Sequence, residues 1–326
     1  MRSLIVGTGS YAPKKVLTNA DLEKIVDTND QWIVERTGIR ERHIADSSEA
    51  TSDLAYQAAV KALEMARLAP EDVEMIVVGT VTPDMPFPST ACFVQARLGN
   101  KKAFAFDVTA ACAGSLYALA TADRFVASGA VKNALVIGAD TLTRVCDWTD
   151  RNTCILFGDA AGAMVLKPTD DPRRGILSVH LHADGSLANI LNQPGGGSRH
   201  PFSQQVLDER LTYIKMKGPE VYKVAVRALE DVCREALDAN GMTAGDLAQV
   251  IAHQANKRIL DSTLHRLGVP AEKCWMNLEK YGNTSSASVP TTLDEANRAG
   301  RLNAGDALLM MAIGGGMAWG SALVRW

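Results

Sequence analysis

Cys112 combines a reactive side chain with a position that favours nucleophilic chemistry. It follows the apolar, β-prone residues 106–108 and opens a helical pattern over residues 112–128. The start of a helix carries partial positive charge, which favours a thiolate. Only small residues flank the thiol, so a substrate carbonyl could come close. A buried structural cysteine is the commoner role for this residue type, but this position favours a nucleophile.

His253 and Asn283 are the polar residues best placed to assist such a nucleophile. His253 follows the apolar residues 250–252, and α/β folds place catalytic groups at strand ends. Asn283 lies in the loop Gly282-Asn283-Thr284-Ser285-Ser286. A histidine at a helix cap and an ordinary polar turn are the alternatives for these two residues.

Two glycine motifs lead to opposite expectations. Gly314, Gly315 and Gly316 follow a buried strand, where a backbone N–H could join that of Cys112 in an oxyanion hole; a tight bend is the plainer explanation. Residues 7–12 match the dinucleotide pattern G-x-G-x-x-A, but Pro13 follows where a helix would be needed. A nicotinamide oxidoreductase is therefore a disfavoured alternative.

Composition excludes several classes of protein. The chain has 326 residues, a net charge of −3 and 47% hydrophobic residues, so it is not a general nucleic-acid binder. Its six cysteines form no CxxC pair, and His180 and His182 lack a third ligand of suitable spacing, so no metal is expected. The first residues do not resemble a signal peptide, and glycines interrupt the uncharged residues 307–324. We expect a cytoplasmic protein with no membrane span.

The order of the expected elements predicts an α/β protein with a mixed sheet and helices on its faces. Apolar runs that predict strands alternate with helical patterns along the chain. Helices are expected over residues 19–34, 52–68 and 112–128, strands over 4–7, 73–79 and 134–138, and two strands around a glycine loop over 307–324.

The pattern also repeats, which predicts two copies of one α/β unit. Residues 69–77 resemble residues 243–251, and residues 157–166 resemble residues 316–324. We therefore expect an N-terminal half over residues 1–171 with the cysteine and a C-terminal half over residues 172–326 with the histidine and asparagine. In such a repeat, the Asn283 loop is the counterpart of the Cys112 loop and faces it across the seam. Residues 195–218 have no counterpart and predict an irregular insertion.

These motifs together resemble the β-ketoacyl-acyl-carrier-protein synthase III family, the initiating condensing enzymes of bacterial fatty acid synthesis. The resemblance rests on Ala111-Cys112-Ala113-Gly114, His253-Gln254-Ala255-Asn256-Lys257-Arg258 and Tyr281-Gly282-Asn283-Thr284-Ser285, and it covers essentially the whole chain. It implies a thiolase-like, duplicated five-layer αβαβα fold with two mixed sheets, in a homodimer.

The resemblance also implies a ping-pong decarboxylative Claisen condensation. Cys112 would take the acyl group of a short acyl-CoA, for which acetyl-CoA is expected, and release CoA. Malonyl-acyl-carrier-protein would then lose CO2, with His253 and Asn283 donating hydrogen bonds to the developing negative charge. The amides of Cys112 and Gly315 would stabilise the tetrahedral oxyanion, and no cofactor would take part.

Other residues take their implied roles from the same resemblance. Residues that would bind CoA are Thr28, Trp32, Arg36, Arg151 and Asn256, with the adenine between Trp32 and Arg151. Residues that would meet the acidic carrier protein are Gln254, Ala255, Asn256, Lys257 and Arg258, with Lys215, Lys217 and Lys223 beside them. Phe87 would reach across the dimer to line the partner's acyl pocket. For the lysines, an ordinary solvated surface is the alternative.

Two further alternatives belong to the same fold. One is a condensing or acyl-transfer enzyme of a secondary pathway, such as quinolone or polyketide assembly. The other is a catalytically inactive binding module, which the presence of Cys112, His253 and Asn283 disfavours.

Overall fold

Two mixed β-sheets form the framework of the protein. The structure, a computed structural model, describes residues 1–326. The first sheet has the strand order β1 (Arg2–Tyr11), β7 (Asp159–Thr169), β6 (Ala134–Thr141), β4 (Met75–Gly79) and β5 (Phe104–Val108). The second has the order β11 (Gln249–Ala252), β12 (Ala307–Gly314), β13 (Ala318–Arg325) and β8 (Gly175–Ala183).

The two sheets repeat one topology, as the sequence repeat predicts. The pairs β1–β7 and β7–β6 are antiparallel and β6–β4 is parallel; β8–β13 and β13–β12 are antiparallel and β12–β11 is parallel. The fifth strand of the first sheet, β5, pairs in parallel with β4. At the corresponding edge of the second sheet there is only a single parallel bridge between Val250 and Cys274.

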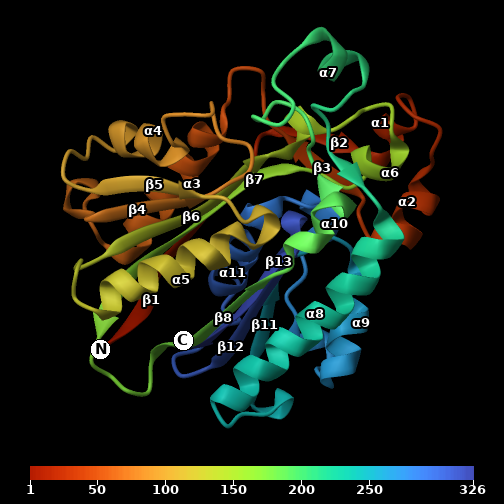
Figure 1. The fold of residues 1–326 in the computed structure, drawn as a ribbon. Helices are drawn as coiled ribbons and strands as arrows, with labels where there is room; N and C mark the ends of the chain where they lie inside the picture. Colours follow the sequence, from red (N-terminus) through yellow and green to blue (C-terminus); the bar gives the residue numbers. More distant parts are fainter.

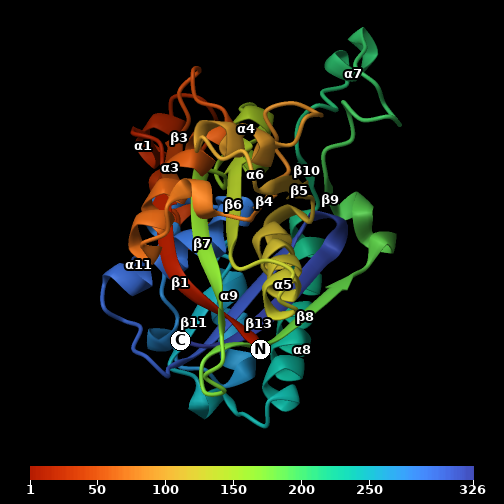
Figure 2. The same ribbon diagram turned by 90° about the vertical axis from the view of Figure 1, so that its left-hand side faces the viewer.

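Helices cover both sheets and fill the space between them, which gives five layers (Figures 1 and 2). The outer layer on the first sheet contains α3 (Thr51–Ala66) and α4 (Thr90–Arg97), and that on the second contains α8 (Gly218–Ala239) and α9 (Lys257–Leu267). The middle layer is α5 (Gly114–Ala127) and α11 (Ser288–Arg298). Shorter elements are β2 (Lys15–Thr18), α1 (Asn19–Leu22), α2 (Asp30–Thr37), β3 (Glu41–Ile44), α6 (Arg151–Cys154), β9 (Leu191–Asn192), α7 (Gln204–Asp208), β10 (Lys215–Met216) and α10 (Leu278–Tyr281). No helix of the structure is both long enough and apolar enough to cross a membrane.

The dinucleotide-like motif lies inside a strand. β1 continues from Gly7 through Gly9 to Tyr11 and pairs with β7, so no turn and helix follow the glycines. The glycines instead let β1 approach α3. An added Cβ would lie 2.3 Å from Ala62 O at Gly7 and 2.3 Å from Ala58 O at Gly9. The motif therefore serves packing.

One predicted helix is wrong. Residues 19–34 form two short helices, α1 and α2, separated by residues 23–29. Thr18 and Asp21 form a capping box at the start of α1, and Asn29 Oδ1 accepts from Trp32 N at 2.8 Å at the start of α2. A polar side chain that caps a helix begins a new helix, so the single amphipathic pattern is divided. The other predicted helices and strands are present, with ends shifted by a few residues.

The predicted boundary between the halves, after residue 171, lies in the turn between β7 and β8. One hydrophobic cluster nevertheless joins both halves, since Leu116 and Leu119 of α5 belong to it together with Val289 and Leu293 of α11. The division into 1–171 and 172–326 stays a prediction.

The predicted insertion contains only α7 and β10 as regular structure, and it extends beyond the two sheets (Figures 1 and 2). Gly195 N donates to Leu211 O at 2.7 Å, which closes the segment on itself. Arg210 forms an ion pair with Asp147 of the main body.

Candidate active site

Cys112 lies in the turn between β5 and α5. The turn is a short 3-10 helix, η2 (Ala111–Ala113), and Ala111 before the cysteine has a left-handed φ of 46°. Non-glycine residues adopt this conformation rarely, and such residues concentrate at functional sites. The turn presents Cys112 with only 8% of its surface exposed.

The second half contains the same turn before its middle-layer helix. The 3-10 helix η7 (Ser285–Ala287) precedes α11, and Ser285 has a φ of 53°. Each turn packs on the strand end of the other half: η2 on β12 and η7 on β6. A Cβ on Gly314 would lie 2.4 Å from Cys112 N, and one on Gly138 would lie 2.1 Å from Ser286 O. The seam therefore brings the two loops together as the repeat predicts.

His253 lies directly after β11 and is almost fully buried. Its backbone N donates to Met311 O at 2.7 Å, whereas neither ring nitrogen has a hydrogen-bond partner. Burial lowers the pKa of His253 to about 4. The imidazole is therefore neutral at physiological pH and can offer one N–H donor and one nitrogen acceptor.

Asn283 is held by both its backbone and its side-chain oxygen. Asn283 N donates to Leu156 O at 2.8 Å, and Gly158 N donates to Asn283 O at 3.0 Å. Its Oδ1 accepts from Ser285 N at 2.9 Å, which leaves the Nδ2 donor for another group.

Cys112, His253 and Asn283 line one narrow cavity of about 130 Å³. Its remaining walls are mostly apolar, with Leu156, Phe157 and Ile313 among them. A second, wider cavity of about 720 Å³ also reaches Cys112 and is bounded by β9 and the glycine loop. The thiol thus stands between two spaces, one of which contains the two polar side chains.

Burial acts on the Cys112 thiol in the direction opposite to the expected helix effect. Burial raises the pKa of Cys112 to about 12, and the charge of Asp140 adds to the rise. Burial therefore opposes the thiolate that the start of α5 favours, and activation of Cys112 by the helix start stays a prediction.

The glycine loop approaches Cys112 through two residues. Gly314 makes the closest approach, while Gly315 lines the wider cavity beside Cys112 and begins the 3-10 helix η8 (Gly315–Met317). Gly316 has a φ of 73°, which a glycine adopts without strain. The loop thus brings main chain without side chains to the nucleophile.

Trp32 is enclosed by the two arginines predicted to accompany it. The guanidinium carbons of Arg36 and Arg151 lie 4.6 and 5.0 Å from the centre of its ring. Arg151 also donates to Asp27 O at 2.8 Å, and the buried Thr28 hydroxyl nearby in sequence has no partner. The structure therefore brings together an aromatic ring and two cations, the groups that hold a purine and its phosphates.

Asn256 lines the narrow cavity, but its side chain is already engaged in hydrogen bonds. Oδ1 caps α9 by accepting from Arg258 N at 2.9 Å, and Nδ2 donates to Arg36 O at 3.0 Å. The residue joins the cavity to the Trp32 region.

The prediction that Gln254 meets a carrier protein is wrong. Gln254 is fully buried, its Oε1 accepts from Asn277 N and Leu278 N, and its Nε2 donates to Trp275 O. The residues that follow Gln254 are more exposed, because α9 begins at Lys257 and lies in the outer layer. Ala255 is half-buried, whereas Lys257, paired with Asp261, and Arg258 are exposed.

Phe87 is 83% exposed and lines neither cavity of its own chain. Sequence reasoning missed the apolar walls formed by Leu156, Phe157 and Met317, because such residues do not differ in type from core residues. Nowhere in the structure do three or more histidine, cysteine or acidic side chains converge to hold a metal ion.

The duplicated sheets and the composite site at their seam place the chain in the thiolase-like class of α/β proteins. Residues 106–185 match the family 3-oxoacyl-[acyl-carrier-protein (ACP)] synthase III, and residues 237–326 match its C-terminal region. A β-ketoacyl-[acyl-carrier-protein] synthase III of Desulfitobacterium hafniense is 54% identical over 99% of this chain and 97% of its own, and one of Xanthomonas campestris is 56% identical over 99% and 98%.

Solved structures agree with these relatives. The 3-oxoacyl-[acyl-carrier-protein] synthase III of Aquifex aeolicus superposes with a TM-score of 0.93 at 49% identity, covering 99% of this chain and 100% of its own. The priming β-ketosynthase of the R1128 polyketide pathway has a TM-score of 0.92 at 36% identity, covering 99% and 96%. The chain therefore belongs to the β-ketoacyl-[acyl-carrier-protein] synthase III family.

Proposed function

We propose that this protein condenses a short acyl-CoA with malonyl-acyl-carrier-protein to start fatty acid synthesis. The observation that carries the proposal is the narrow cavity in which Cys112, His253 and Asn283 meet. Its two hydrogen-bonding side chains stand beside a thiol, and both can donate to a developing negative charge.

In the first step the Cys112 sulfur attacks the acyl-CoA carbonyl. The Cys112–acyl bond forms, the bond to the CoA sulfur breaks, and the thiol proton passes to the leaving CoA. The neutral His253 has a free nitrogen that can relay this proton. The amides of Cys112 and Gly315 donate to the tetrahedral oxyanion, for which the glycine loop leaves space.

In the second step malonyl-acyl-carrier-protein loses CO2. The electrons of the broken carbon–carboxyl bond move to the thioester oxygen, which accepts hydrogen bonds from His253 and the Asn283 amide. The carbanion carbon then attacks the acyl group on Cys112 and the carbon–sulfur bond breaks. The thiolate that leaves takes a proton from solvent water, which restores the thiol. Neutral donors suit this step, because a histidine with a pKa of about 4 keeps its N–H without carrying a charge.

The CoA adenine would stack between Trp32 and Arg151 after the Arg151 guanidinium, 5.0 Å from the ring centre in this structure, moves away from the ring, with Arg36 and Thr28 close to the nucleotide phosphates. The pantetheine arm would then pass Asn256 toward Cys112, since Asn256 lines the narrow cavity with Cys112 and donates to Arg36 O. The exposed cations Lys217, Lys223, Lys257 and Arg258 form a surface suited to an acidic carrier protein.

A cytoplasmic homodimer is part of the proposal, as is the absence of a cofactor. Phe87 is exposed and lines neither of the two cavities at Cys112, which suits a residue that enters the partner's acyl pocket. The strand β5 is an unpaired sheet edge, and unpaired edges of this kind pair with a second chain.

Intact-protein mass spectrometry after incubation with acetyl-CoA and longer or branched acyl-CoAs tests the proposal. We expect an acyl adduct on the wild type that is absent from Cys112→Ala, and release of CO2 when malonyl-acyl-carrier-protein is added. Asn283→Ala should still acylate but release little CO2. Failure of every acyl-CoA to modify Cys112 would falsify the mechanism.

A priming enzyme of a polyketide pathway is the second candidate, because such a protein shares the fold at 36% identity. The fatty-acid enzymes match at 54–56% identity over the full length, which favours the first proposal. Measuring condensation with a fatty-acid carrier protein and with a polyketide carrier protein in parallel separates the two.

A further inference from the structure

Asp140 is a fully buried carboxylate at the end of β6 that joins loops from both halves. Its Oδ1 accepts from Thr80 Oγ1 at 2.9 Å, Val81 N at 2.8 Å, Thr82 N at 3.2 Å and Thr82 Oγ1 at 2.9 Å. Its Oδ2 accepts from Ser286 N at 3.1 Å and lies 2.8 Å from Ser286 Oγ. No arginine, lysine or histidine pairs with it, so these polar donors alone stabilise its charge.

Both ends of this hydrogen-bond network reach the reaction site. Val81 lines the wider cavity beside Cys112. On the other side, Ser286 follows Ser285, whose backbone N–H holds the Oδ1 of Asn283. The bonds from Asp140 to Ser286 therefore fix the turn that orients the Asn283 amide.

The sequence repeat gives this network a counterpart. Ser286 occupies in η7 the place that Cys112 occupies in η2. Counted along the two eight-residue strands, Asp140 of β6 corresponds to Ile313 of β12. Ile313 is apolar and lines the narrow cavity with Cys112, whereas Asp140 accepts from the backbone N of Ser286. Of the two equivalent turns, only the one with Ser286 is therefore held by a carboxylate from this strand position.

We propose that Asp140 is a positioning residue for decarboxylation, which locks the Ser285–Ala287 turn and so fixes the Asn283 amide against the malonyl thioester. The proposal rests on the function proposed above. Because the carboxylate acts through Ser286 and Asn283, its loss should affect the malonyl step more than acylation. Its charge also adds to the rise in the pKa of Cys112, of which burial is the leading cause.

The test compares Asp140→Asn with the wild type in the two half-reactions. In this variant a side-chain N–H donor replaces one of the two carboxylate oxygens and faces N–H and O–H groups that also donate. The hydrogen bonds that hold the Ser285–Ala287 turn are therefore lost. We expect kcat for CO2 release to fall about 10- to 100-fold, as for small misplacements of reacting groups. The rate of acyl-adduct formation should stay within about threefold, and the KM for malonyl-acyl-carrier-protein should change little.

A second readout distinguishes positioning from general damage. Because the variant lacks the negative charge near the thiol, the pH profile of Cys112 alkylation should move to lower pH. Asp294→Asn is the matched control: Asp294 is also buried and accepts from Thr8, Ser10 and Arg298, but it joins α11 to β1 away from the cavity. The Asp294→Asn variant should melt at a lower temperature than the wild type, but the rates of both half-reactions should be preserved.

Equal loss of both half-reactions in Asp140→Asn, or no loss, would overturn the proposal. If that variant does not fold, Ser286→Ala tests the same lock from the donor side, and it should show the same selective loss at smaller size. A wild type that never acylates would instead refute the proposed function, which keeps the two failures distinct.

Discussion

Cys112 and His253 share a cavity whose low exposure favours the neutral form of each side chain. The pKa of the thiol rises to about 12 and that of the imidazole falls to about 4. Neither change needs an ion partner, since burial is the leading cause of both. A neutral pair suits an enzyme that must hold an acyl thioester without hydrolysing it and then donate hydrogen bonds to an enolate.

The buried His253 makes folding stability depend on pH. Its pKa is about 4 in the folded chain and about 6.5 in the unfolded chain, so the unfolded chain binds the proton first as the pH falls. The neutral, buried His253 therefore adds about 3 kcal/mol to the free energy of unfolding above pH ~6.5. This contribution falls as the pH drops and is lost by pH ~4. Urea unfolding at pH 7.5 and 5 should show a larger acid-induced loss for the wild type than for His253→Gln. An equal loss in both chains would contradict the assignment.

Removing the Trp32 ring should weaken binding of the nucleotide end of the acyl-CoA donor and leave its acyl end unaffected. Trp32→Ala should raise KM for acyl-CoA about 2- to 30-fold, the range of one cation–π and stacking contact. An acyl-pantetheine donor, which lacks adenosine, should be used equally by both proteins. Loss of activity with acyl-pantetheine as well would contradict the assignment of Trp32 to the nucleotide.

At the scale of elements, glycine positions set how closely strands and helices approach. β1 lies against α3 only because Gly7 and Gly9 carry no side chain there. Gly9→Ala should lower the free energy of unfolding by about 1–3 kcal/mol, the usual cost of overpacking. Gly185→Ala is the control, since an added Cβ there meets nothing within 4 Å. Chemical denaturation of the two variants measures the difference, and equal stabilities would argue against the close contact.

Much of the fold and the convergence of the site could be predicted from the sequence. Apolar periodicity marks β4, β6, α3 and α5, and the repeat of residues 69–77 at 243–251 implies that the Cys112 and Asn283 loops face each other. Such patterns are local or recur, so a single sequence displays them.

Other features depend on contacts that no local pattern records. The rise in the pKa of Cys112 follows from burial by residues distant in the chain, and the role proposed for Asp140 depends on Thr80, Thr82 and Ser286. Gln254 stands next to exposed cations in the sequence, yet its side chain points inward to Asn277. The break between α1 and α2 could be located only from the capping hydrogen bonds of Thr18 and Asn29.

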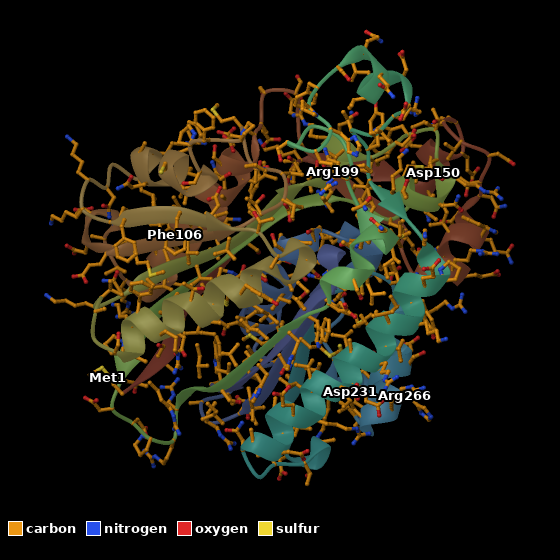
Figure 3. The ribbon with its side chains drawn as sticks, viewed as in Figure 1. Met1, Phe106, Asp150, Arg199, Asp231 and Arg266 are labelled. Atoms are coloured by element: carbon orange, nitrogen blue, oxygen red, sulfur yellow. The ribbon has the colours of Figure 1, made fainter.

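At the scale of the whole molecule, an aromatic sheet edge is the surface that the proposed dimer would use. Phe104 of β5 is 42% exposed; its ring centre lies 6.3 Å from that of Phe106 and 5.5 Å from that of Phe125 on α5. Phe106 is labelled on this edge in Figure 3. An unpaired strand with exposed aromatic rings supports association of two sheets edge to edge.

If the proposed dimer forms through this edge, Phe104→Glu should convert it to a monomer at micromolar concentration, because the substitution would bury a charge in the interface. Sedimentation velocity measures the change. Ile25→Glu is the control, since Ile25 is a comparably exposed apolar residue between α1 and α2, on the side of the molecule away from β5 (Figure 1). A dimer that survives in Phe104→Glu would place the interface elsewhere.

Each of the two turns packs on a strand of the other half of the chain, and this has a consequence during protein synthesis. The turn that presents Cys112 packs on β12, which leaves the ribosome long after the cysteine does. A growing chain therefore carries a thiol that is neither buried nor shaped by its turn, with the acidity of an ordinary cysteine. Oxidants and alkylating metabolites would reach it most easily during translation, and the finished fold closes that period of vulnerability.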